Sequence, residues 1–151
     1  IQDYMDYQTM TDFIISNTDE HLLNFGVLRD SNTMKLIGPA PIFDSGNSMF
    51  YKEERILPYS KVELLSYPIN SFYKTEKKML ANVRNRNIVK FDLLPDPAEI
   101  KSLYEQFGLP EKKADFISQN YEKKLELVHE FQLGKTISLY HEKIKERTSV
   151  Y

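Results

Sequence analysis

The strongest constraint on the fold is a pair of helix patterns in the second half of the chain. Asp96, Pro97 and Glu99 form a typical helix start, with a capping carboxylate, a proline at the first helical position and a glutamate at the third. Gly108 closes this pattern, and a second apolar stripe at helical spacing continues until Gly134. These patterns predict a mainly α-helical protein.

The remaining patterns predict further helices and one hairpin. Apolar residues at helical spacing predict a first helix, and a capping box of Ser60 with Glu63 predicts another. Two short apolar segments separated by an Asp-Ser-Asn turn resemble the strands of a hairpin. The predicted helices cover residues 3–16, 60–65 and 137–144, and the predicted strands cover residues 25–28 and 34–37.

The composition is that of an ordinary globular domain. Hydrophobic residues make up 41% and charged residues 28% of the 151 residues, and the formal net charge is −2. This excludes a generally cationic polymer binder and a disordered acidic tail. The chain has no cysteine, no apolar run as long as a membrane span and no secretory signal pattern. We therefore expect one cytoplasmic domain over residues 1–151, without a membrane partner.

Two polar loops flank the predicted hairpin. The first contains Asp19 and, five positions later, Asn24. Kinase catalytic loops use this spacing, because the aspartate accepts the proton of the attacking hydroxyl and the asparagine offers an amide oxygen to Mg²⁺. The second loop contains Asp44, twenty residues after Asn24 and directly after a short apolar segment. A hairpin would bring the two loops close enough to share a ligand.

The two loops resemble segments of the HipA family of serine/threonine protein kinases. The run NTDEHLLNF at residues 17–25 is similar to the catalytic segment of that family, and APIFD at residues 40–44 is similar to its metal-binding segment. The resemblance implies that Asp19 is the catalytic aspartate and that Asn24 and Asp44 are metal ligands. It implies that Asn17 and His21 organise the loop.

The resemblance also implies a fold, cofactors and partners. The fold would be the helical C-terminal lobe of a protein-kinase-like fold, with the small β-hairpin carrying the catalytic and metal-binding loops. Mg²⁺ and ATP would be the cofactors, and a protein with a serine or threonine acceptor would be the substrate. An antitoxin-like or DNA-binding protein is a further candidate partner.

One departure from the family pattern concerns the nucleotide. A complete kinase has a loop that covers the ATP phosphates and a lysine that grips them, both before the catalytic helix. Sixteen residues precede the predicted loop, and the chain begins at Ile1 without an initiator methionine. We expect a C-terminal fragment of the kinase whose N-terminal nucleotide lobe is absent, and we expect this fragment alone to be inactive.

Two other functions stay open. The chain could be a non-catalytic interaction or regulatory module related to phage or toxin–antitoxin proteins, in which Asp19 is a turn residue. It could also be a kinase-fold enzyme that phosphorylates a lipid or a small molecule. The D-x-H-x-x-N core at residues 19–24 occurs in lipid-kinase-like enzymes as well, so that core does not identify an acceptor.

Several residue groups have a structural interpretation beside the functional one. His21 is read as a buried hydrogen-bonding residue in preference to a proton shuttle. The six bases between residues 74 and 90 are read as a solvated helix face, with a patch for phosphate, an acidic peptide or nucleic acid as the alternative. The ten tyrosines and nine phenylalanines are expected to serve mainly in packing.

Overall fold

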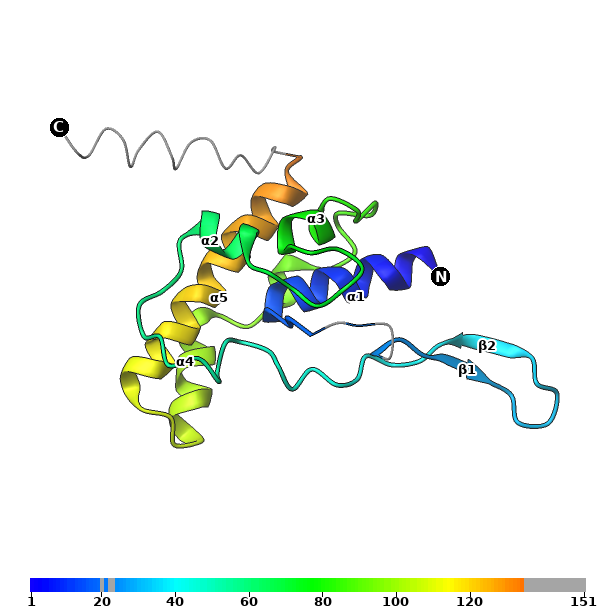
Figure 1. Ribbon diagram of the computed structural model, residues 1–151, viewed down its shortest axis with the longest axis horizontal. Coiled ribbons are helices and arrows are strands. Elements are labelled where there is room, and N and C mark those ends of the chain that lie inside the picture. The colour runs from blue at the N-terminus through cyan, green and yellow to red at the C-terminus, as the bar shows by residue number, and fades with distance from the viewer. Residues whose placement is uncertain (20, 22–23, 135–151) are drawn as a thin grey trace.

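The structure is a computed structural model that describes residues 1–19, 21 and 24–134. This part of the chain is mainly helical and has one small antiparallel sheet, as predicted (Figure 1). The predicted helix over residues 137–144 lies outside the described residues. The elements in chain order are α1 (Gln2–Ile15), β1 (Val27–Arg29), β2 (Leu36–Pro39), α2 (Lys61–Ser66), α3 (Glu76–Leu80), the 3-10 helix η2 (Phe91–Leu93), α4 (Pro97–Gln106) and α5 (Glu111–Gln132).

Helix α1 leads directly into the first polar loop. Met10, Phe13 and Ile14 are its buried apolar residues, whereas Tyr7, which continues the same helical spacing, is 45% exposed. The helix ends at Ser16, which adopts the left-handed conformation with φ 54° and donates its N–H to the Phe13 carbonyl. The predicted end of this helix near residue 16 is therefore confirmed.

The two predicted capping boxes are present. At α2, the Ser60 hydroxyl accepts from the Glu63 N–H at 3.2 Å, and the Glu63 carboxylate accepts from the Ser60 N–H at 2.7 Å. At α4, Asp96 and Glu99 form the same reciprocal pair. Gly108 follows α4 with φ 87°, a conformation that glycine adopts without strain.

Helix α5 is the centre of the molecule. Helices α1, α2 and α4 all pack against it, and α3 packs against α1 and α2 (Figure 1). No helix in the described ranges is long and apolar enough to cross a membrane. The best-buried apolar side chains of the core come from four helices and are Met10, Phe13, Leu64, Leu65, Leu80, Phe116, Ile117, Leu127 and Val128.

A buried ion pair lies inside this core. The Lys124 ammonium of α5 is 2.9 Å from a carboxylate oxygen of Glu76 at the start of α3, and these side chains are 0% and 3% exposed. The same nitrogen lies 3.9 Å from the centroid of the Phe13 ring on α1. Burial lowers the pKa of Lys124 and raises the pKa of Glu76, because removal from water disfavours both charges. The pair thus connects three helices at a high desolvation cost.

The hairpin projects away from the helices (Figure 1). Strands β1 and β2 pair with Val27 opposite Pro39, and a bulge interrupts the register after Leu28. The turn is closed by Asp30, whose carboxylate accepts hydrogen bonds from the backbone of Asn32 and Thr33. The large apolar side chains of the hairpin are all 45% or more exposed, and they are Val27, Leu28, Met34, Leu36 and Ile37.

Aromatic packing accounts for many of the tyrosines and phenylalanines. Phe50, Tyr59, Tyr67 and Phe116 form one cluster, with ring centroids 5.1–6.4 Å apart. The Glu53 carboxylate accepts hydrogen bonds from both tyrosine hydroxyls of this cluster. Phe13, Tyr121 and Phe131 are buried elsewhere in the core. Some other aromatic side chains are largely exposed, and they include Phe43, Phe72 and Phe107.

The buried ion pair gives a stability prediction. Replacing Lys124 by Met should lower the free energy of unfolding by about 3–5 kcal/mol, because the Glu76 carboxylate is left buried without its partner. The double variant Glu76→Met/Lys124→Met should recover at least half of that loss. Urea unfolding followed by circular dichroism measures both changes.

The matched control is Lys61→Met. Lys61 also pairs with glutamates, Glu126 and Glu130 of α5, but it lies at the surface. An exposed pair contributes about 0–1 kcal/mol, so this variant should stay close to the wild type. Equal losses from Lys61→Met and Lys124→Met would contradict the role given to the buried pair.

Candidate active site

Asn17 connects the end of α1 to the first polar loop. Its side chain is 4% exposed, and its amide nitrogen donates to the Asp12 carboxylate at 2.8 Å. Its backbone N–H donates to the Asp12 carbonyl, also at 2.8 Å. The Asn17 amide oxygen in turn accepts from the Asp19 N–H at 3.4 Å. These contacts connect Asn17 both to the end of α1 and to Asp19.

The loop is closed by Asn24. Its side chain is buried, and its amide nitrogen donates to the Asp19 carbonyl at 2.7 Å. Its backbone N–H donates to the carbonyl of His21, whose own side chain is half-buried. Because the amide nitrogen is engaged, the amide oxygen is the atom that Asn24 can offer to a ligand. One hydrogen bond therefore joins Asp19 and Asn24, the two ends of the five-residue spacing.

A segment far along the chain holds the Asp19 side chain. The Asn70 amide nitrogen donates to an Asp19 carboxylate oxygen at 2.8 Å, and the Asn70 N–H donates to the Thr18 carbonyl at 2.9 Å. Asn70 lies in a turn closed by the bridge between Pro68 and Thr75. No sequence pattern pointed to Asn70, because fifty-one positions separate it from Asp19.

Asp44 lies at the same end of the hairpin as Asn24. The Ala40 N–H donates to the Gly26 carbonyl at 2.8 Å, so pairing of the two chain segments continues to the base of the hairpin. A Cβ at residue 26 would lie 2.9 Å from the Ala40 Cβ and 3.5 Å from the Phe43 ring. Glycine is thus required where these segments cross.

Asp44 forms no hydrogen bond with the first loop within the described residues. Asp44 is exposed and has φ 59°, and the apolar segment before it is not a strand, since β2 ends at Pro39. Proline at residues 39 and 41 removes the N–H donors that a longer ladder would need. Within the described ranges, no hydrogen bond or ion pair joins Asp44 to Asp19 or Asn24. The same residues contain no cluster of three carboxylate or imidazole groups that could hold a metal ion.

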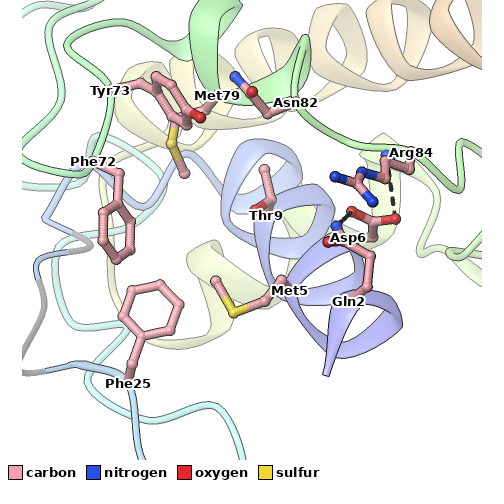
Figure 2. Close-up of a pocket in the computed structure, with 10 residues that line it drawn as sticks. All are labelled: Gln2, Met5, Asp6, Thr9, Phe25, Phe72, Tyr73, Met79, Asn82 and Arg84. Atoms are coloured by element: carbon pink, nitrogen blue, oxygen red, sulfur yellow. Dashed lines mark hydrogen bonds between the residues drawn. The ribbon is translucent and has the colours of Figure 1, made fainter.

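A pocket of about 360 Å³ lies beside the first loop, between α1 and the segments around residues 72 and 82 (Figure 2). Figure 2 shows Phe25 and Phe72 on one side of it and Met5 and Thr9 of α1 on the other. At its far end the Asp6 carboxylate accepts hydrogen bonds from the side chain of Gln2 and from backbone N–H groups. Burial raises the pKa of Asp6, but the hydrogen bonds outweigh it and hold the pKa below its usual value.

A scan against protein-family models, a search of curated proteins and a search of solved structures each found no match to this chain. The geometry of the loop, of the hairpin and of the pocket is therefore the basis for any functional assignment.

The role of Asn17 can be tested by its removal. Asn17→Ala should lower the free energy of unfolding by about 1–3 kcal/mol, because the buried Asp12 carboxylate loses a hydrogen-bond donor. It should also speed hydrogen exchange at the amide of Asn24. Urea unfolding and exchange measured by NMR report the two effects, and Asn32→Ala in the exposed hairpin turn is the control. Unchanged exchange at Asn24 would exclude a loop-organising role.

Proposed function

We propose that this chain is the helical catalytic lobe of a HipA-like serine/threonine protein kinase. The observation that carries the proposal is the hydrogen bond from the Asn24 side chain to the Asp19 carbonyl. It joins two residues that lie five positions apart, and one Asp19 carboxylate oxygen and the Asn24 amide oxygen receive no hydrogen bond from the described residues. Kinase chemistry requires both groups from one loop.

Asp19 would act on the acceptor hydroxyl. One of its carboxylate oxygens accepts from Asn70, which fixes the side chain, and the second oxygen receives no hydrogen bond from the described residues. That oxygen would orient the serine or threonine hydroxyl and take its proton. The hydroxyl oxygen would form a bond to the γ-phosphorus as the bond to the β-phosphate oxygen breaks, which leaves ADP.

Asn24 and Asp44 would hold Mg²⁺. An amide oxygen and a carboxylate are hard oxygen donors of the kind that this ion prefers, and the base of the hairpin places both residues at one end. When bound, Mg²⁺ supplies charge neutralisation of the ATP phosphates. The absence of cysteine supports a reducing compartment such as the cytoplasm.

Metal binding can be tested on this chain with Mn²⁺ as a paramagnetic probe. Mn²⁺ should broaden the NMR signals of the Asn24 side-chain amide and the Asp44 backbone amide before others. Asp44→Asn should weaken the binding about tenfold, because a charged ligand is lost, whereas Asp92→Asn at another exposed site should have no effect. Equal broadening in both variants would remove Asp44 from the site.

Catalysis can be tested in a kinase that contains this lobe together with a nucleotide-binding lobe. Asp19→Asn should lower kcat by about 10²–10⁴-fold and leave the KM for ATP nearly unchanged, because only proton transfer and acceptor orientation are lost. Transfer of ³²P from ATP to a protein acceptor, a lipid and a small alcohol measures the rate and separates these acceptor classes. Full activity of both Asp19→Asn and Asp44→Asn would reject the kinase.

A second candidate, a non-catalytic interaction module, is favoured by the exposed hairpin. An isolated two-stranded hairpin is at best marginally stable in water, and the apolar side chains of β1 and β2 stay exposed. In an interaction module, Leu36→Lys would abolish binding to a partner protein, and Asp19→Asn would change nothing. In the kinase, Asp19→Asn would be the damaging substitution.

A further inference from the structure

The pocket of Figure 2 and the Asp19 carboxylate are built on the same two chain segments. Phe25 directly follows Asn24, and Phe72 lies two residues after Asn70. The Phe25 and Phe72 rings meet edge to face, with centroids 5.4 Å apart and an interplanar angle of 62°. Both asparagines donate hydrogen bonds to Asp19. A molecule held against these rings would therefore lie next to the candidate catalytic carboxylate.

The lining of the pocket suits a large apolar side chain. Met5 and Met79 add flexible thioethers to the two phenyl rings, and methionine adapts to apolar groups of different shape. Asn82 and Arg84 provide a polar side to the pocket (Figure 2). Its volume of about 360 Å³ is at the lower end of the range for ligand sites, which allows one large side chain or two small ones.

Residues 74–90, a segment next to the pocket, contain more basic than acidic residues. Glu76 is the acidic residue between positions 74 and 90, and it is buried against Lys124. Arg86 is engaged with the carbonyl and the ring of Phe131. The other five bases are exposed and form no ion pair within the described residues, although Arg84 interacts electrostatically with Asp6, and they are Lys74, Lys77, Lys78, Arg84 and Lys90.

Three of these bases lie next to the pocket. Arg84 lines it, Lys74 follows the lining residue Tyr73, and Lys78 precedes the lining residue Met79. The Lys78 carbonyl also accepts a hydrogen bond from the Asn82 side chain. The positive stretch is therefore continuous in sequence with residues that line the pocket, and Arg84 lines the pocket itself.

We propose that this pocket binds the protein substrate, taking an aromatic or large aliphatic side chain of an acidic segment near the phosphorylated residue. The proposal rests on the kinase function above and adds the class of acceptor to it. The apolar side chain would fill the space between the phenyl rings and α1, and the acidic residues would pair with Arg84 and its neighbouring lysines.

A polypeptide fits this site better than a nucleic acid. The Phe25 and Phe72 rings pack edge to face, so they do not present two parallel faces between which a base could stack.

The test is a binding measurement without ATP and without metal. The probe is a fluorescein-labelled peptide of twelve residues with one serine, one phenylalanine three positions away and three glutamates. Fluorescence anisotropy should give a submillimolar Kd, and replacement of the phenylalanine by alanine in the peptide should weaken binding about tenfold. Replacement of its glutamates by lysines should abolish binding.

Variants of the protein locate the peptide. Phe72→Ala should weaken binding about tenfold, and Arg84→Ala should weaken it about threefold and reduce its dependence on salt. Both side chains are exposed, so the fold should persist, which circular dichroism checks. The controls Phe107→Ala and Lys112→Ala remove an exposed ring and an exposed base elsewhere and should leave the Kd unchanged.

Three results would overturn the proposal: no binding of the peptide, equal effects of the pocket and control variants, or tighter binding of a twelve-nucleotide oligothymidine that Phe72→Ala weakens. The measurement is independent of the kinase test. Peptide binding without Mn²⁺ binding would count against the kinase and for the pocket. Mn²⁺ binding without peptide binding would count against the pocket alone.

Discussion

The structure depends on a lysine that has been removed from water. Lys124 lies at the centre of the longest described helix, and its ammonium meets the Glu76 carboxylate and the face of the Phe13 ring. These contacts tie α5, α3 and α1 together at one point. Neither charge tolerates burial alone, so an arrangement of the helices that buries one of them without its partner is disfavoured.

The candidate active site is supported by this assembly. Helix α1 contributes Phe13 to the core and Asp12, one residue earlier, to the anchoring of Asn17. The turn before α3 contributes Asn70, which holds Asp19 from the other side. The loop is thus fixed by two elements that the buried ion pair connects. Asn17 and Asn24 bind the backbone of Asp19 and Asn70 binds its carboxylate, which orients a proton acceptor before the reaction and lowers the reorganisation that the reaction requires.

Local signals in the sequence predicted the parts of the fold that neighbouring residues determine. The capping boxes at Ser60 and Asp96 and the helix end near Ser16 were confirmed, because capping depends on residues within one turn. The contacts of Asn70 and Lys124 were not predicted, since their partners lie fifty-one and forty-eight positions away. The five-residue helix α3 was missed for a related reason. A helix this short has little periodicity, and its position is set by tertiary packing.

The missed ion pair also changes how the basic stretch is understood. From sequence, Glu76 partly balances the six bases between residues 74 and 90, which favours an ordinary solvated helix face. In the structure, Glu76 faces inward and pairs with Lys124, so its negative charge lies in the core. It therefore does not balance the exposed bases of its own segment. The pairing that holds the helices together therefore also exposes unbalanced positive charge beside the aromatic pocket. The Glu76 carboxylate therefore contributes to the stability of the core and also affects the surface charge of its segment. In this way the buried ion pair bears on the proposed recognition of an acidic substrate.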